Sequence, residues 1–267
     1  HNLKNIYKMK KLLFTIAIGS LLMASCTSTR YTATYDVELS NVKKTEKGKP
    51  TISVGSLDTI KGVGKNCYSD STIKVCFTPT KKDIGFTLTN LTDENLKLVW
   101  DESLITTIGS QSRVMHDGIK FIDRNSFQRP SVIYPNQTLN DIVTPTENVY
   151  WRDGVYSQYS STPGGWEQKP LILDKSYVEG YGTEVMDSTE FTNFVKSMSD
   201  GGTININLPL TTDDNKRKDY QFNFDINNGK VYPVEVVDKK KSTTVGYVVA
   251  IVSGVLTYML TMSALNW

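Results

Sequence analysis

Strict alternation of apolar and polar residues over two stretches is the feature that most limits what this chain can fold into. Residues 203–208 (TININL) and 220–226 (YQFNFDI) place every second side chain on one apolar face. A period of two residues is the period of a β-strand, and a single apolar face is typical of an antiparallel sheet on a shared core. Weaker signals of the same kind predict further strands at residues 131–134 and 138–143.

Two hairpins are expected upstream of these strands. Residues 84–90 and 96–100 are apolar-polar stretches separated by a short polar turn. Residues 113–116 and 119–122 flank the dipeptide Asp117-Gly118, which suits the positive φ angles of a tight hairpin turn. The sequence therefore favours strands that pair with their neighbours along the chain.

One helix is predicted from apolar residues spaced i, i+3, i+4 and i+7, namely Phe191, Phe194, Val195 and Met198. Asp187 and Glu190 match a capping box before it, and Gly201 with Gly202 would end it. Many short strands with a single helix indicate an all-β fold. We expect an antiparallel β-sandwich of immunoglobulin-like type over residues 51–230, with this one short helix.

The first 25 residues predict export. Lys10 and Lys11 are followed by an unbroken uncharged run, which is too short to span a bilayer but suits a secretory signal. Residues 22–26 (LMASC) resemble a bacterial lipobox, with Met23 in place of the more usual leucine. We therefore interpret residues 1–25 as upstream residues and a lipoprotein signal peptide, and Cys26 as the lipidated cysteine. The alternative is a buried helix with a chance cysteine.

Residues 26–50 are rich in threonine, serine and lysine and show little apolar periodicity. We interpret them as a flexible tether, in which residues 31–39 could add an edge strand. At the other end, residues 231–244 form a basic linker before an uncharged stretch at 245–265.

That stretch has 21 residues, which is about 30 Å as a helix and enough to cross a hydrocarbon core. We predict a C-terminal transmembrane helix there, and a buried core helix is the alternative. Small residues recur every four positions on one face, a spacing that would allow helix packing and a homodimer; they are Gly246, Ala250 and Gly254.

With Cys26 lipidated, Cys67 and Cys76 remain as a pair. The segment between them contains a turn signal, so a hairpin would bring the two sulfur atoms together in an oxidising compartment. The alternatives are two buried free thiols or a metal pair. The metal pair is the weaker one because a structural zinc site needs four ligands.

Catalysis finds little support. The chain has no G-x-S-x-G elbow, phosphate-binding loop or H-E-x-x-H helix, and His116 with Asp117 and Asp123 nearby is better explained as structural. Residues 213–215 and 225–229 lack calcium-loop spacing and are interpreted as turns. Lys and Arg number 30 against 28 Asp and Glu, which gives no basic footprint for a nucleic-acid partner. We expect no enzymatic activity, cofactor or metal.

Aromatic residues gather between positions 149 and 182 among glycines and prolines that break regular structure. Aromatic rings on irregular loops provide binding area at low entropic cost. The candidate binding surface consists of Tyr150, Trp151, Tyr156, Tyr159 and Trp166. The alternative is that these rings fill one end of the sandwich under a long loop.

Several short stretches resemble a group of uncharacterised small envelope lipoproteins from Gram-negative bacteria. They lie within residues 86–151, which make up about a quarter of the chain, and they are residues 100–102, 113–118, 123–125, 130–133 and 148–151. This resemblance implies an envelope location and no particular activity. The layout of lipidated N-terminus, β-rich middle and C-terminal span is also similar to phage unimolecular spanins, which link the outer and inner membranes and fuse them.

The sequence thus predicts a lipoprotein of the bacterial cell envelope with its β domain in the periplasm. Thr27 after the lipidated cysteine favours the outer membrane. We expect a binding or scaffolding module with an envelope protein or glycan as partner, held to membrane lipid through Cys26 and residues 245–265. A spanin-like tether is the alternative, and an envelope hydrolase is the third hypothesis.

Overall fold

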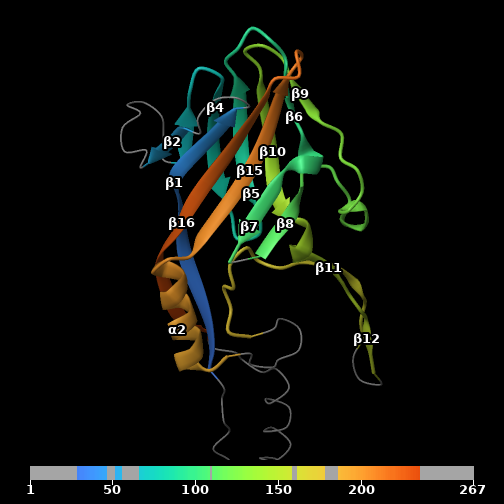
Figure 1. Ribbon diagram of the computed structural model, residues 1–267. Helices are drawn as coiled ribbons and strands as arrows, with labels where there is room; N and C mark the ends of the chain where they lie inside the picture. The colour runs from blue at the N-terminus through green and yellow to red at the C-terminus, as the bar shows by residue number, and fades with distance from the viewer. Residues whose placement is uncertain are drawn as a thin grey trace, which may run out of the picture. The chain divides into compact units, whose positions relative to one another are not determined.

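A mostly antiparallel β-sheet of twelve strands makes up the body of the protein in the computed structural model (Figure 1). The structure describes residues 29–46, 52–55, 66–108, 110–157, 161–177 and 186–234. Nearly all of them belong to one unit, Tyr31–Tyr232. The elements of the large sheet are β1 (Arg30–Glu46), β2 (Ile52–Gly55), β3 (Cys67–Ser69), β4 (Ile73–Pro79), β5 (Ile84–Asn90), β6 (Leu96–Leu98), β7 (Leu104–Thr107), β8 (Ser110–Met115), β9 (Ser131–Ile133), β10 (Thr138–Pro145), β15 (Thr203–Thr212) and β16 (Arg217–Val234).

The two stretches of strict alternation form the central pair of strands, β15 and β16. Their register places the apolar residues of one strand directly opposite those of the other, as in the pairs Ile204–Phe224, Ile206–Phe222 and Leu208–Tyr220. All six side chains are buried. The alternation in the sequence is therefore the core face of this antiparallel pair.

The predicted immunoglobulin-like sandwich is wrong, because the structure has one large sheet where a sandwich has two. The strand order is β2-β1-β16-β15-β7-β8-β10-β5-β4-β3. The first part of β10 pairs with β5, and its last two residues, Thr144 and Pro145, pair with β8. This change of partner along one strand joins the halves that a sandwich would keep separate.

The sheet curls until its two ends face each other across the core. The ring of Phe77 on β4 lies 4.8 Å from that of Phe222 and 5.1 Å from that of Phe224, both on β16. At the seam, Asn66 bridges to β1: its side-chain oxygen accepts the Leu39 N–H at 2.8 Å and its amide donates to the Val37 carbonyl at 3.4 Å. The sheet is therefore nearly closed, with side chains linking its ends.

Neither predicted hairpin forms. The strands β5 and β6 follow one another but do not pair, since β6 pairs with β15 and β9. The buried Asn90 side chain redirects the chain between them by donating to the Glu94 and Ile133 carbonyls. Gly118 has the expected positive φ of 80°, but the residues after it form a 3-10 helix, η2 (Phe121–Asp123), and not a strand.

The predicted helix is confirmed as α2 (Ser188–Ser199). The Asp187 carboxylate accepts the N–H groups of Thr189 and Glu190, and the Glu190 side chain accepts the Asp187 N–H, as a capping box requires. Phe191 and Val195 are buried against Ala33 of β1. The helix thus covers the first part of β1.

The disulfide between Cys67 and Cys76 is present, and the free-thiol and metal alternatives are excluded. The two residues are directly opposite each other on β3 and β4, with their Cα atoms 4.0 Å apart. The hairpin predicted from the turn signal between them is therefore confirmed.

The predicted tether at residues 26–50 differs from the structure, which has the 17-residue strand β1 over Arg30–Glu46. This threonine-rich and lysine-rich sequence forms a strand in which the side chains of Ala33, Leu39 and Val42 are buried. The ladder to β16 makes it an integral part of the sheet.

The predicted fold also contained a C-terminal transmembrane helix, and this part of the prediction is not borne out. Within the described ranges no helix is long and apolar enough to cross a membrane; α2 has 12 residues, whereas a span needs about 20. Residues 245–265, with the stripe Gly246, Ala250 and Gly254, lie outside the described residues. So do the predicted signal peptide, Cys26 and most of the predicted basic linker.

Candidate functional site

The aromatic segment forms a two-part hairpin that stands apart from the large sheet (Figure 1). Its first part pairs β11 (Val149–Arg152) with β14 (Gly165–Gln168), and its outer part pairs β12 (Val155–Tyr156) with β13 (Ser161–Thr162). We call residues 149–168 the arm. The sequence predicted irregular loops here, whereas the structure has two short antiparallel ribbons.

Two glycines explain how these ribbons join. A Cβ atom on Gly164 would lie 2.9 Å from the Arg152 carbonyl oxygen and 2.9 Å from the Gly154 nitrogen. A Cβ on Gly154 would lie 2.7 Å from the ring of Tyr156. The backbones therefore cross so closely that only glycine fits on either side.

One face of the arm carries its tryptophans. Trp151 and Trp166 are directly opposite each other, and their ring centroids are 5.7 Å apart in an edge-to-face arrangement. The Arg124 guanidinium lies 4.7 Å from the centroid of the Trp166 ring. Trp166 is thus half-buried under the loop after η2, while Trp151 is 53% exposed.

The other face carries a polar cluster. The Glu167 carboxylate accepts hydrogen bonds from the Arg152 guanidinium and from the Tyr150 hydroxyl, the latter at 3.0 Å. The bond from Arg152 is the main reason that the pKa of Glu167 lies below its usual range. Tyr150 is therefore engaged within the arm and is half-buried, so it adds little contact area.

The outer part of the arm is exposed and uncharged. Tyr156 is 72% exposed and Val155 is 47% exposed. No charged residue occurs between positions 154 and 166 in the sequence. Tyr159 lies outside the described residues, so of the five predicted binding residues the structure leaves Trp151 and Tyr156 as the open ones.

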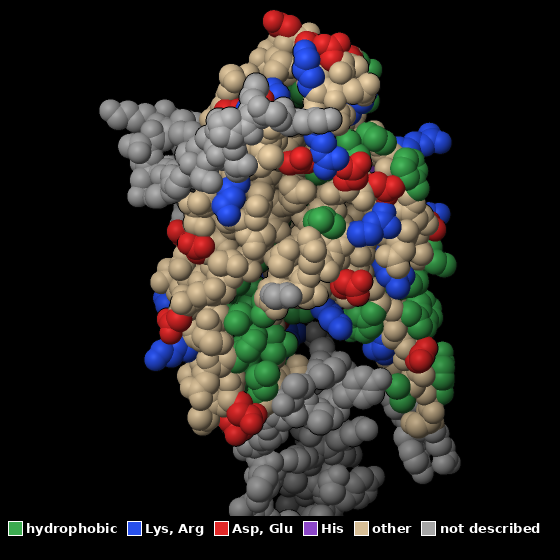
Figure 2. Space-filling view, viewed as in Figure 1, with side chains coloured by type: hydrophobic (Ala, Val, Ile, Leu, Met, Phe, Trp, Pro, Cys, Tyr) green, Lys and Arg blue, Asp and Glu red, His purple; other side chains and the backbone are tan. Residues whose placement is uncertain are grey.

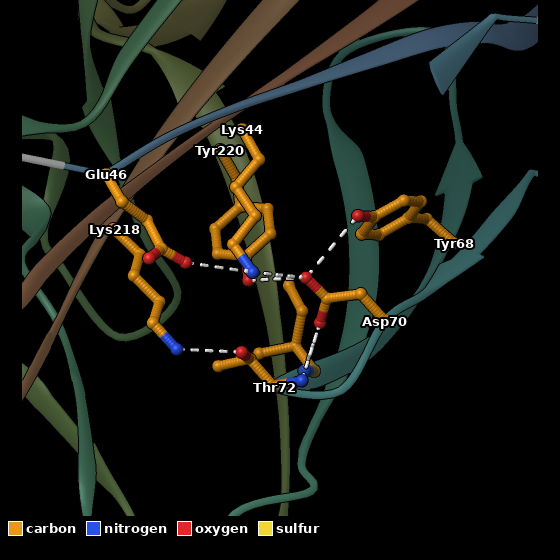
Figure 3. A network of polar contacts seen from close by, with 8 residues as sticks. Lys44, Glu46, Tyr68, Asp70, Thr72, Lys218 and Tyr220 are labelled. Carbon is orange, nitrogen blue, oxygen red and sulfur yellow. Dashed lines mark hydrogen bonds and ion pairs between the residues drawn. The ribbon is translucent and has the colours of Figure 1, made fainter. Parts of the chain in front are cut away.

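A polar network that the sequence did not predict centres on Asp70, between β3 and β4 (Figure 3). Its carboxylate accepts hydrogen bonds from the Lys44 ammonium at 2.8 Å, the Tyr220 hydroxyl at 2.9 Å and the Tyr68 hydroxyl at 3.4 Å. It also accepts the backbone N–H groups of Thr72 and Ile73. These bonds join β1, β4 and β16, and only the turn around Asp70 was visible in the sequence.

The pKa values around Asp70 follow from these contacts. Burial would raise the pKa of Asp70, but the bonds from Lys44, the two backbone N–H groups and Tyr220 outweigh it and hold this pKa below its usual range. Burial and the nearby Asp70 charge raise the pKa of Tyr68 to about 12 and that of Tyr220 further. An ionised Asp70 with two neutral tyrosines is a structural clamp across the seam, with no group poised for proton transfer near neutral pH.

His116 is held in a structural environment. Its ring stacks on that of Trp100 at 4.5 Å between centroids, and its Nδ1 lies 3.5 Å from the Asp141 carboxylate. The Asp117 N–H donates to the other Asp141 oxygen. The carboxylate facing the imidazole is therefore Asp141 and not Asp123, which lies in η2.

A cavity of about 450 Å³ lies beside the seam. Its walls come from β1, from the turn between β4 and β5, and from residues 171–174. Lys81 and Asp174 form an ion pair there at 3.1 Å, and the Tyr35 hydroxyl donates to the Leu173 carbonyl. These wall groups bond to one another, which favours the exposed arm as the candidate site.

Comparisons with known proteins give no indication of the function. No family model, no curated protein and no solved structure matches this chain.

Proposed function

We propose that this protein is a non-enzymatic module of the bacterial cell envelope that binds another envelope component through its arm. The observation that carries the proposal is the exposure of Trp151 and Tyr156 on a ribbon separate from the large sheet. Aromatic side chains provide large contact areas at low entropic cost and are typical of recognition surfaces. Figure 2 shows hydrophobic side chains along this arm at the lower right of the view.

The form of the arm supports the proposal. An isolated two-stranded ribbon is marginally stable in water unless something packs against it. The inner ribbon has such support from Arg124, whereas among the described strands β12 and β13 pair with each other and with no third strand. A ribbon with an exposed aromatic residue, Tyr156, at its outer part is suited to gain its packing from a partner.

The disulfide supports an extracytoplasmic site of action. Bonds such as Cys67–Cys76 form in oxidising compartments and are rare in the cytosol. We retain lipidation at Cys26, with outer-membrane placement and a periplasmic domain, as part of the proposal. No cofactor or metal is part of it, and an envelope hydrolase is not favoured because His116 faces a tryptophan ring and a structural carboxylate.

The spanin-like alternative finds no support in the fold. Tyr31 near the start of β1 and Val231 near the end of β16 both pack on the cluster formed with α2. The two ends of the described unit therefore leave it at the same side. A tether between two membranes would more naturally have its ends on opposite sides.

Photo-crosslinking in cells that express the full chain tests the proposed function. A photoreactive phenylalanine analogue replaces Tyr156 in one variant and Tyr134, which is 62% exposed on a distant turn, in the other. We expect a defined adduct, whether with protein, glycan or lipid, from position 156 and none from position 134. Equal yields from both positions, or none from either, would contradict the proposal.

A further inference from the structure

The arm emerges from the end of the molecule at which β1 begins. The Gln168 side chain at its base donates to the Lys82 carbonyl in the turn between β4 and β5. Leu171, just beyond the base, donates its N–H to the Lys81 carbonyl of the same turn. The chain then reaches Ser176, which exchanges hydrogen bonds with Tyr31 at the start of β1. Figure 1 shows the arm and the first part of β1 at the same, lower end.

We infer that the arm contacts the headgroup region of the membrane to which the N-terminus is anchored, an inference that rests on the proposed function. Cys26 precedes Tyr31 by five residues, so a lipid on Cys26 keeps the start of β1 within about 18 Å of the bilayer surface. From Asn148 at its base to Tyr156 the arm has eight residues, which is about 26 Å of strand. The reach of the arm and the reach of the linker are thus of the same order.

The chemistry of the arm fits a lipid headgroup region. Tryptophan and tyrosine are enriched there because each ring has an apolar body and a polar group that finds water or headgroups. Trp151 and Tyr156 supply such side chains, and Val155 adds an exposed apolar one. No charged side chain between positions 154 and 166 would oppose burial of the outer ribbon at the edge of the hydrocarbon layer.

A protein or glycan partner is less well matched to these residues. Sugar and peptide sites combine rings with polar groups that fix the orientation of the ligand. On the arm the charged groups are Arg152 and Glu167, which bond to each other on the face away from Trp151, and Asp153, whose carboxylate accepts the Trp151 indole N–H at 3.1 Å. The outer ribbon offers mainly apolar area and hydroxyl groups, which suits a fluid interface.

The opposite end of the sheet supplies a matched control. The N–H of Gln137 donates to the Tyr134 carbonyl, and the N–H of Asn90, the last residue of β5, donates to the Gln137 carbonyl. Tyr134 therefore lies at the end of β5 that is remote from the arm, and it is nearly as exposed as Tyr156. Non-specific association of exposed aromatic residues with the membrane would affect both positions, whereas contact through the arm would affect Tyr156 alone.

The test uses the full-length lipoprotein in vesicles of phosphatidylethanolamine and phosphatidylglycerol (3:1). Variants Tyr156→Cys and Tyr134→Cys each carry a polarity-sensitive fluorophore on the new cysteine. We expect a blue shift in emission and quenching by nitroxide-labelled lipids at position 156, with neither change at position 134. The same water-like emission at both positions would overturn the inference.

Two further outcomes separate this inference from the proposed function. A change at position 156 that requires peptidoglycan sacculi or a second protein, without quenching by nitroxide lipids, would overturn lipid contact and leave the arm as a binding surface. Uptake of the fluorophore by Cys26 in the unsubstituted chain would show that the anchor is missing. That result would overturn the inference, while the crosslinking experiment would still decide the proposed function.

Discussion

Trp151 and Trp166 face each other across the arm with their ring planes at 77°. Only one of the two rings is supported by the body of the protein, since Arg124 covers Trp166 and leaves Trp151 open. The pair therefore connects the supported base of the arm to an exposed ring. Any change that separates these rings should affect the arm without affecting the large sheet.

The first prediction concerns the glycine crossing inside the arm. Gly164→Ala places a methyl group 2.9 Å from two backbone atoms, so we expect strain of about 1–3 kcal/mol that opens the arm. Limited proteolysis should cut between residues 152 and 165 faster than in the wild type, while the thermal midpoint of the large sheet stays the same. Gly165→Ala is the matched control, because a Cβ there meets no atom within 4 Å. Equal proteolysis of both variants would refute the close crossing.

The second prediction concerns the clamp at the seam. Asp70→Asn removes the charge that pairs with Lys44 and weakens the bonds from both backbone N–H groups. We expect a loss of about 2 kcal/mol in the free energy of unfolding, measured by urea titration, since hydrogen bonds to a charged group contribute about 1.5–3 kcal/mol and this site is only partly buried. Tyr68→Phe removes the longest bond, 3.4 Å, and should cost less. A larger loss for Tyr68→Phe would contradict this account of the network.

The third prediction follows from the lowered pKa of Asp70. A carboxyl whose pKa is lower in the folded state stabilises the fold above its unfolded pKa of about 3.9. That stabilisation is lost as the pH falls through the lower, folded pKa. The difference in unfolding free energy between the wild type and Asp70→Asn should therefore be largest near neutral pH and shrink below about pH 4. A difference that stays constant down to pH 2 would show that Asp70 does not act through its charge.

The fourth prediction concerns the disulfide. Joining Cys67 to Cys76 closes a short loop in the unfolded chain, and the chain-entropy relation gives about 3 kcal/mol of stabilisation. The double variant Cys67→Ser, Cys76→Ser should lose that amount in urea unfolding, and reduction of the wild type should produce the same loss. If reduction changed the stability of the double variant as well, the effect would belong to another thiol.

Local patterns in the sequence predicted the elements whose partners are close along the chain. The capping box of α2, the hairpin at Cys67–Cys76 and the adjacent strands β15 and β16 all depend on neighbouring residues. A short stretch of sequence is enough to predict these elements, because residue spacing and capping side chains within that stretch determine them.

The elements that the sequence predicted wrongly depend on distant partners. The strand β6 pairs with β15, more than 100 residues later, so the turn after β5 could not reveal its true neighbour. The strand β10 changes its partner from β5 to β8 between Val143 and Thr144, and an alternation of apolar and polar residues does not reveal such a change. The arm was missed as a ribbon because its close crossing needs the glycines that otherwise predict loops.

The first and last long strands of the sheet are neighbours, and this imposes an order of assembly. The Asn228 amide on β16 donates to the Asp36 carboxylate on β1 across 192 positions of the chain. Pairs so far apart in sequence form slowly, because a long loop must close before they contribute. Because the chain is synthesised from its N-terminus, β1 would therefore keep an open edge until β16 is made, and during that interval a chaperone or another strand would be able to bind it.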